Sequence, residues 1–279
     1  MSIPKSSIKV DAAHSDNIWS LNWTTQSQIL TGSLDGTIKL WSINQESSQL
    51  HCQAVSKRRH VAVTSVLSSK DNSTAVVCYQ DSVIKFYSLI DLTESLQPIE
   101  PGILEAWTIS LSPSDDVIAA GTHKGTVNIW STGEGHELVG TLDAHCKFIL
   151  STDFNMDNKL ATSSVDGYLN VFDIETKQVI HKIEAHSMPA RKVTFSYDGK
   201  LIYTCSDDRH VSIYDSISGN IINSFSQTGM ALSVDVSTDH RHFVVGCSDH
   251  TVSYWDLGMQ RRIQSYDNHK DQVWSVSFD

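Results

Sequence analysis

Hydrophobic and polar residues alternate in short runs along the whole chain, and no segment keeps the 3.6-residue apolar period of an amphipathic helix. In residues 147–183 the strand-like runs are KFILSTDF, KLATSSV, YLNVFDI and QVIHKI, which are rich in apolar and β-branched residues. The short polar breaks between them are MDN, DG and ETK, as expected for turns between antiparallel strands. The pattern predicts an all-β chain made of units of four short strands.

The four-strand unit recurs along the chain. Its third strand reads TIKLWS at 37–42, VIKFYS at 83–88, TVNIWS at 126–131, YLNVFD at 168–173, HVSIYD at 210–215 and TVSYWD at 251–256. The aromatic residue of this strand returns every 41 to 46 positions. A single four-stranded sheet cannot bury both of its faces, so repeated sheets are expected to pack radially around an axis. Residues 1–279 are therefore predicted to form one domain.

An aspartate and a histidine recur with this unit. Six residues before the aromatic, five of the six units carry an aspartate: Asp35, Asp81, Asp166, Asp208 and Asp249. A histidine precedes the aromatic by 27 or 28 residues in four units: His14, His60, His145 and His186. The carboxylate is expected in the tight turn between the second and third strands, where it accepts backbone and imidazole hydrogen bonds. Because active sites are not normally copied into every unit, these pairs are predicted to be structural, with no catalytic residue.

The His…Asp…aromatic-Asp pattern with this period resembles that of the WD-repeat family. The segments AAHSDNIWSLNW, AWTISLSP, GTHKGTVNIW, HSMPAR and SDDRHVSIYD further resemble the WD-repeat subunits that the superkiller complex shares, in animals, with the polymerase-associated factor complex. This resemblance implies a non-catalytic scaffold, monomeric within a hetero-complex. Its implied partners are the tetratricopeptide-repeat and helicase subunits of the superkiller complex, which serves exosome-linked 3′-to-5′ mRNA decay, and the subunits of the polymerase-associated factor complex, which serves transcription elongation and histone modification. The implied locations are nucleus and cytoplasm.

The resemblance also implies a seven-bladed β-propeller. His269 follows the last aromatic by the same fourteen residues that separate Phe172 from His186, so it opens a seventh copy. The sequence ends at Asp279, one strand into that copy. We therefore expect seven blades, the seventh incomplete at the C-terminus and built from residues 272–278 with the opening strand 7–10. The second repeat departs from the pattern, since Gln80-Asp81-Ser82 replaces the usual Asp-Gly turn.

One position of the repeat varies in a way that a uniform core would not allow. It holds Trp19, Ser65, Trp107, Leu150, Arg191, Leu232 and Trp274, directly after a position that is small or apolar throughout. In WD propellers this position faces the top opening of the channel, and Trp and Arg dominate the hot spots of interfaces. The predicted partner-binding rim contains Trp19, Trp107, Arg191, Trp274, Asn17, Glu105, Phe148 and His123, with Trp274 beside Trp19. The alternative is that the tryptophans simply fill the channel.

Charge and composition narrow the function further. The chain carries 21 basic and 32 acidic residues, a net charge of −11, which disfavours direct binding of nucleic acid. Its five cysteines form no C-x-x-C pair, and there is no phosphate-binding glycine loop or G-x-S-x-G, so neither metal, cofactor nor enzyme activity is expected. No apolar run is long enough to span a bilayer, and no apolar signal segment is present. A different propeller function, substrate recognition within a ubiquitin ligase or chromatin complex, stays open.

Overall fold

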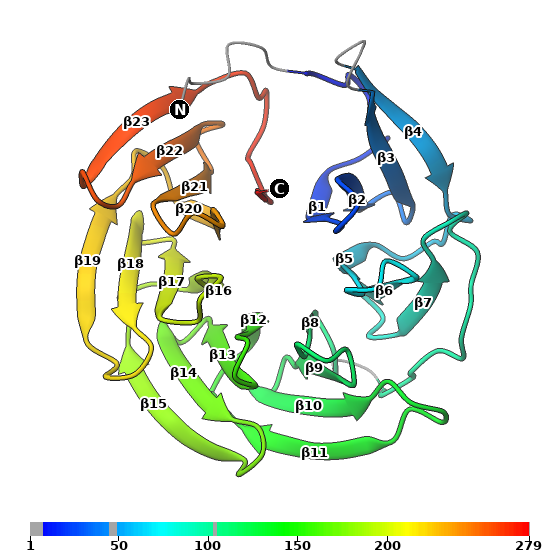
Figure 1. The fold of residues 1–279 in the computed structure, drawn as a ribbon, viewed down its shortest axis with the longest axis horizontal. Coiled ribbons are helices and arrows are strands. Elements are labelled where there is room, and N and C mark those ends of the chain that lie inside the picture. The colour runs from blue at the N-terminus through cyan, green and yellow to red at the C-terminus, as the bar shows by residue number, and fades with distance from the viewer. Residues whose placement is uncertain (1–7, 45–48, 103–104, 279) are drawn as a thin grey trace.

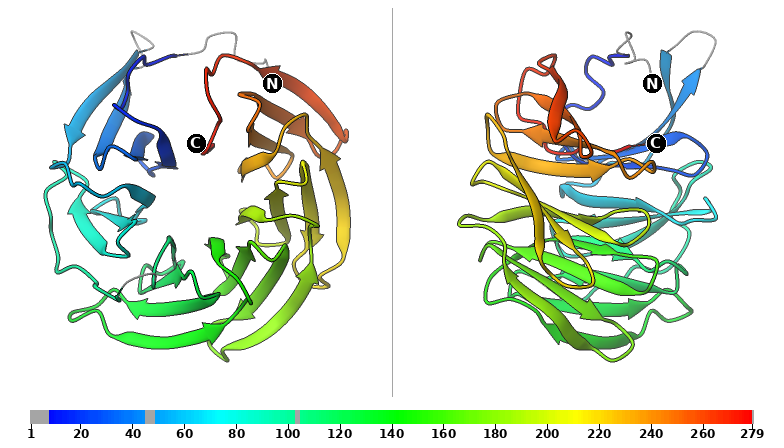
Figure 2. Two further views of the ribbon diagram at one scale, coloured as in Figure 1. Left: turned by 180° about the vertical axis from the view of Figure 1, so that it is seen from behind. Right: turned by 60° about the vertical axis from the view of Figure 1, so that its left-hand side comes forward.

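The computed structural model describes residues 8–44, 49–102 and 105–278. Over these residues the chain forms 23 strands in six antiparallel sheets, five with four strands and one with three. The sheets are arranged as the blades of a propeller around a central channel (Figure 1), and the views from behind and from the side show the same ring (Figure 2). The described part of the chain contains no helix that is long and apolar enough to cross a membrane.

Within each blade the strands neighbour one another in chain order, from the channel outward. Blade 1 contains β1 (Ile18–Trp23), β2 (Gln28–Ser33), β3 (Ile38–Asn44) and β4 (Gln49–Val55). Blade 2 contains β5 (Val63–Ser68), β6 (Thr74–Tyr79) and β7 (Ile84–Ser88). Blade 3 contains β8 (Thr108–Leu111), β9 (Val117–Gly121), β10 (Thr126–Ser131) and β11 (Leu138–Asp143).

The second half of the ring repeats this order. Blade 4 contains β12 (Ile149–Phe154), β13 (Lys159–Ser164), β14 (Tyr168–Asp173) and β15 (Gln178–Glu184). Blade 5 contains β16 (Ala190–Phe195), β17 (Leu201–Ser206), β18 (His210–Asp215) and β19 (Ile221–Ser226). Blade 6 contains β20 (Ala231–Val236), β21 (His242–Cys247), β22 (Val252–Asp256) and β23 (Arg261–Tyr266).

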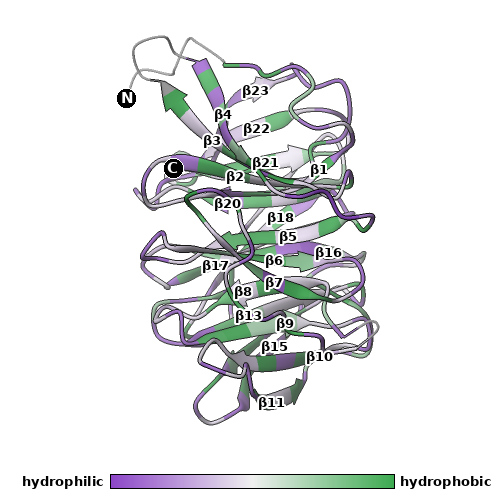
Figure 3. Cartoon of the chain, turned by 90° about the vertical axis from the view of Figure 1, so that its right-hand side faces the viewer, coloured by the Kyte–Doolittle hydropathy of each residue, from purple (hydrophilic) through white to green (hydrophobic). Residues whose placement is uncertain are grey.

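The core lies between adjacent blades rather than inside any one of them. Leu30 and Leu40 of blade 1, for example, pack in one cluster with Val63, Val66 and Val77 of blade 2, all almost completely buried. Figure 3 shows hydrophobic stretches within the strands and hydrophilic residues along many of the loops. Each sheet therefore depends on its neighbours to remove its apolar faces from water.

The prediction of a seven-bladed propeller is wrong, because the described residues form six blades. After β23 the chain turns inward and its described part ends between β20 and β1, without any strand being formed there (Figure 1). A lone extended segment has no neighbouring strand with which to exchange backbone hydrogen bonds in a ladder. Residues 8–10 add no strand either, and Ser7 lies outside the described residues.

Residues 273–278, here called the closing segment, connect blade 6 to blade 1. Toward blade 6, the amide of Val276 donates to Ser233 Oγ at 3.2 Å and the amide of Phe278 donates to Asp235 Oδ2 at 2.7 Å. Toward blade 1, the closing segment accepts hydrogen bonds from the amide of Leu21, at Ser275 Oγ (3.2 Å), and from the indole of Trp23, at the carbonyl of residue 277 (3.3 Å). The ring is thus continuous at the seam between blades 6 and 1.

The same side-chain-to-backbone bonds connect innermost strands elsewhere in the ring, and we call them latches. From blade 1 to blade 2, Ser20 Oγ accepts from the amide of Val66 at 3.0 Å and Asn22 Oδ1 accepts from the amide of Ser68 at 3.1 Å. From blade 4 to blade 5, Asp153 Oδ2 accepts from the amide of Phe195 at 2.8 Å. The closing segment therefore occupies the place of an innermost strand.

Blade 2 is shifted by one residue relative to the alignment of repeats made from the sequence. In its inner hairpin Val63 pairs with Tyr79, and in the inner hairpin of blade 1 Ile18 pairs with Ser33. The hairpin of blade 2 is therefore one residue longer. In blade 2 the position equivalent to Trp19 is therefore Thr64 instead of Ser65. By the same shift, Arg59 instead of His60 stands at the position of His14.

Candidate functional site

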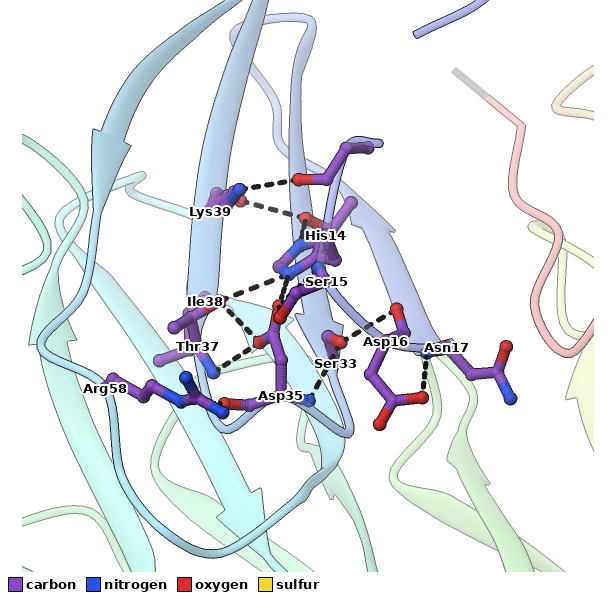
Figure 4. Close-up of polar contacts among 12 residues, drawn as sticks. His14, Ser15, Asp16, Asn17, Ser33, Asp35, Thr37, Ile38, Lys39 and Arg58 are labelled. Atoms are coloured by element: carbon purple, nitrogen blue, oxygen red, sulfur yellow. Dashed lines mark hydrogen bonds and ion pairs between the residues drawn. The ribbon is translucent and has the colours of Figure 1, made fainter. Parts of the chain in front are cut away.

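The recurring histidine and aspartate meet at the end of blade 1 (Figure 4). His14 Nδ1 lies 3.0 Å from Asp35 Oδ2, and His14 Nε2 lies 2.8 Å from Thr31 Oγ1. The indole of Trp41 donates to the same Thr31 oxygen at 3.0 Å. Asp35 Oδ1 also accepts from the amide of Thr37 at 2.8 Å. The four side chains thus join the loop before β1 to β2, the following turn and β3.

The electrostatics of this group favour a structural role. Burial lowers the pKa of His14 against the opposing effect of Asp35, so the imidazole is neutral at neutral pH. Burial would raise the pKa of Asp35, but hydrogen bonds from Thr37 and Ser15 hold that pKa below its usual range. An imidazole between a carboxylate and a hydroxyl could in principle relay a proton. Here both ring nitrogens are hydrogen-bonded inside the blade and the side chain is buried, which leaves no room for a substrate.

The arrangement recurs in two other blades. In blade 4, His145 lies 3.1 Å from Asp166 and 2.8 Å from Thr162, and in blade 5, His186 lies 2.9 Å from both Asp208 and Thr204. Burial lowers the pKa of both histidines. The structure does not bring His60 to Asp81: His60 is exposed, and Arg59 Nη2 lies 3.0 Å from Asp81 Oδ2 instead.

The turn aspartates have one interaction in common. Each accepts a hydrogen bond from the backbone amide two residues later, and these amides belong to Thr37, Val83, Tyr168, His210 and Thr251. In blade 6 the carboxylate of Asp249 also accepts from the hydroxyl of Thr228. The aspartate therefore fixes the turn whether or not a histidine is present.

Four of the eight predicted rim residues, Trp19, Trp107, Arg191 and Trp274, line one cavity of about 310 Å³ at one end of the channel, here called the mouth. The other four, Asn17, Glu105, Phe148 and His123, are not part of its lining. Its lining includes Trp19, Thr64, Trp107, Leu150, Arg191, Leu232 and Trp274. In five blades the rim residue falls at a β-bulge: in blade 1, Ile18 pairs with Ser33 and Ser20 with Gly32, which leaves Trp19 without a partner. A bulge turns the extra residue out of the ladder. It thereby allows a large side chain to stand in the channel opening.

An aromatic cluster begins at the mouth with Trp19 and Trp107 and continues outside its lining through Phe148 and His123. The rings of Trp19 and Trp107 are 5.8 Å apart, and Trp107 also meets Phe148 edge-on at 5.2 Å. His123 stacks on Phe148 at 4.0 Å with only 7° between the ring planes. Trp274 lines the same cavity. It was expected beside Trp19, but among the described residues the ring of Trp19 contacts that of Trp107 instead.

The charged residues of the predicted rim are paired. Arg191 donates from Nε and Nη2 to the two carboxylate oxygens of Asp207, at 2.8 and 2.7 Å, and this pairing raises the pKa of Arg191. Glu105 forms an ion pair with Lys124. Asn17 is exposed, and its carbonyl accepts from the amide of Leu34 at 2.9 Å. The mouth therefore offers half-buried aromatic surface beside Arg191, the charge of which is neutralised by Asp207.

The other end of the channel contains acidic residues that the repeat comparison did not single out. Asp153, Asp235 and Lys192 line a cavity of about 300 Å³ there. Burial raises the pKa of Asp153 to about 6 and also raises the pKa of Asp235. The signal was present in the sequence, because a serine stands two residues before each of these acids and before Asn22.

The described residues contain no group of three or more His, Cys, Asp or Glu side chains arranged to hold a metal ion. Cys78, Cys205 and Cys247 are buried, and burial raises the pKa of Cys78, the thiol of which is hydrogen-bonded inside its blade. Cys146 is exposed. The buried thiols are thus packed as small apolar side chains.

The profile of the WD40 family (WD domain, G-beta repeat) matches residues 5–42, 103–131, 136–173, 177–215 and 219–256. The chain belongs to this family. The residues between the first two matches, 43–102, include all of blade 2, which also lacks the His–Asp pair.

Individual relatives are WD-repeat proteins or similar in fold. The chain is 29% identical to the WD repeat-containing protein SL1-17 of Schistosoma mansoni, over 75% of the chain and 70% of the relative. It is 31% identical to the WD repeat-containing protein VIP3 of Arabidopsis thaliana, over 67% of the chain and 63% of the relative. It is 27% identical to the meiotic recombination protein rec14 of Schizosaccharomyces pombe, over 75% and 68%. A chain in the crystal structure of the mitotic checkpoint complex superposes with a TM-score of 0.81 over 99% of this chain and 92% of that chain, at 15% identity, which shows the fold alone.

Proposed function

We propose that this WD40 protein is a non-catalytic scaffold subunit that binds partner proteins through the mouth. The finer assignment is to the superkiller complex, in exosome-linked mRNA decay, and to the polymerase-associated factor complex, in transcription elongation and histone modification. Its support is the resemblance of segments such as AWTISLSP and HSMPAR to the WD-repeat subunits of these assemblies. The corresponding sites of action are cytoplasm and nucleus.

The observation that carries the binding role is the convergence of three tryptophans on one cavity. Trp19, Trp107 and Trp274 come from sequence positions up to 255 residues apart, yet they line the same 310 Å³ mouth. Tryptophan side chains in partly enclosed positions contribute a large share of the energy of protein interfaces. The propeller fold is also typical of non-catalytic interaction scaffolds.

The test is alanine substitution of Trp19, Trp107 and Trp274 together. If each contributes about 2 kcal/mol, the affinity for a mouth-bound partner should fall by about four orders of magnitude. The measurement is quantitative recovery of partners by affinity purification, carried out separately on nuclear and cytosolic extracts. Circular dichroism and thermal unfolding should show that the variant keeps its fold.

A matched control replaces exposed hydrophobic residues far from the mouth, namely Tyr197, Ile217 and Ile221 of blade 5. The control should recover partners as the unaltered protein does. Unchanged recovery by a folded tryptophan variant contradicts the binding role of the mouth. Recovery of a ubiquitin ligase or chromatin complex, in place of the two proposed assemblies, would retain the mouth and replace the assignment.

A further inference from the structure

The outer side of blade 2 differs from that of the other described blades. Blade 2 has three strands, and after β7 the chain runs along the circumference toward blade 3 (Figure 1). This stretch touches β7 through two isolated bridges, Ile84 with Ile99 and Tyr87 with Glu94. Residues 96–100 and the turn 132–136 of blade 3 enclose a cavity of about 660 Å³, here called the side groove.

At two other junctions the equivalent space is filled. The turn of blade 4 reaches back over β11, where Lys177 Nζ donates to the carbonyl of Val139 at 3.0 Å. The turn of blade 5 reaches back over β15, where His181 Nε2 lies 3.1 Å from the carbonyl of Ser216. At the side groove the corresponding turn meets β7 directly, through His136 stacked on Phe86 at 4.6 Å. The outer edge of β7 is itself covered by residues 93–99, since the amide of Ile84 donates to the carbonyl of Ile99 at 3.0 Å and the amide of Ser95 donates to the carbonyl of Phe86 at 3.0 Å. The side groove lies between this stretch and the turn 132–136.

The walls of the side groove define the chemistry of an occupant. Leu96, Ile99 and Trp130 provide apolar surface, and Leu96 is 52% exposed. Glu100 and Glu134 stand exposed on the two opposite lips, and no lysine or arginine lines the groove. A segment that enters between the lips therefore gains by burying an apolar side chain and by placing positive charge beside the two carboxylates.

We infer that the side groove binds an extended segment of a partner protein in which an aliphatic side chain is flanked by lysine or arginine. The segment lies between residues 96–100 and the turn 132–136, on the outer side of the stretch that pairs with β7. This docking site is separate from the mouth and goes beyond the function proposed above. A partner can occupy both at once, because the mouth opens on the channel and the side groove lies on the circumference.

Short capped peptides test the inference. The first has the sequence Ser-Arg-Leu-Arg-Ser, the second replaces its leucine with serine, and the third replaces both arginines with glutamate. Titration is followed by NMR on the indole N–H of Trp130, assigned with Trp130→Phe. The leucine peptide should bind at least about ten times more tightly than the serine peptide, and the glutamate peptide should not bind detectably.

A charge reversal and its control locate the site. Glu134→Lys should weaken binding of the leucine peptide about five-fold or more at low salt, and added salt should reduce this difference. Glu137→Lys makes the same change in net charge on the same turn, but residue 137 does not line the groove, so affinity should stay within about two-fold. The triple alanine variant of the mouth should bind the peptide normally.

Three results would overturn the inference. One is the absence of any Trp130 shift at millimolar leucine peptide. Another is equal weakening by the lysine substitutions at 134 and 137, which would indicate non-specific attraction to an acidic protein. The third is concentration-dependent sedimentation of the free protein that Leu96→Asp abolishes, because the groove would then belong to a contact with a second copy.

Discussion

Blades 1 and 2 are neighbours that share a core cluster, yet their polar interiors are built differently. In blade 1, Asp35 is almost fully buried and holds His14, which in turn bonds Thr31. In blade 2, the carboxylate of Asp81 is 35% exposed and pairs with Arg59, the guanidinium of which lies 4.4 Å from the ring of Tyr79. The hydroxyls of Tyr79 and Tyr87 bond one another at 2.7 Å inside that blade.

The comparison separates what a blade requires from what it can exchange. Both aspartates accept a hydrogen bond from the amide two residues later, so the turn is fixed in both blades. The polar group inside the blade can be exchanged. In blade 1 the buried imidazole of His14 links the turn to the interior, and in blade 2 the pair of Tyr79 and Tyr87 occupies the interior. Blade 2 also lies outside the residues that match the family profile.

The largest expected effect is from Asp35→Ala. This substitution removes the acceptor for His14, Ser15 and Thr37 from a buried site, and it should lower the free energy of unfolding by about 3 kcal/mol. Urea denaturation is the measurement. Asp81→Ala in blade 2 is the matched control, and because its carboxylate is partly solvated the loss should be below about 1 kcal/mol. Equal losses would show that the two blades depend on their aspartates to the same extent.

A smaller effect is expected from Tyr87→Phe in blade 2. The change leaves the buried hydroxyl of Tyr79 without its partner and should cost about 1.5 kcal/mol. Tyr214→Phe is the control, because that hydroxyl donates to a backbone carbonyl, that of Ala185, at 3.2 Å. Thermal and urea unfolding of both variants should show the greater loss for blade 2. A loss below that of Tyr214→Phe would mean that the tyrosine pair does not replace the histidine link.

The smallest effect is expected at the latches. Asn22 accepts the hydrogen bond that links blade 1 to blade 2, whereas Asp153, a carboxylate, accepts the one that links blade 4 to blade 5. Asp153→Asn keeps an acceptor for Phe195 and removes a carboxylate that is costly to ionise in the channel. At pH 7.5 the variant should be more stable by about 1 kcal/mol, allowing for water in the channel.

The pH dependence follows from the pKa of Asp153, which is about 6 in the folded protein and about 4 when unfolded. Between these values the folded protein binds more protons, so the unaltered protein gains stability from this group as the pH falls from 7 to 4. The advantage of Asp153→Asn should therefore shrink toward pH 4. An advantage that is constant with pH would contradict the raised pKa.

The sequence was sufficient for the repeat, the all-β class and the family, because the aromatic and the turn aspartate return at nearly constant spacing. It misplaced His60 and Ser65, since the inner hairpin of blade 2 is one residue longer than that of blade 1. It assigned seven residues to one position of the repeat, and six of them stand at that position and line the mouth. In blade 2 the position belongs to Thr64, and Ser65 lines the mouth beside it. The function of that rim stays a prediction.

Other features depend on contacts that periodicity does not encode. The predicted number of blades was wrong. A β-strand forms only where a second strand pairs with it, and the closing segment pairs with no strand among the described residues. The stacking of His123 on Phe148 joins residues of two blades, and the side groove lies between residues 96–100 and the turn 132–136 of blade 3. The latch residues were visible as a serine two positions before an acid or amide, but only the geometry shows what they bind.

The seam has a thermodynamic consequence for binding. The closing segment is held to blade 1 by two hydrogen bonds, from the amide of Leu21 and from the indole of Trp23, whereas the other neighbouring blades also share a hydrophobic core cluster between their sheets. Opening of the ring at this point should therefore require less free energy than separation of blades elsewhere. Because Trp19 and Trp274 lie on opposite sides of the seam, any ligand that contacts both indoles binds only the closed ring. Such a ligand stabilises the closed ring, and any change that favours the closed ring raises the affinity for the ligand.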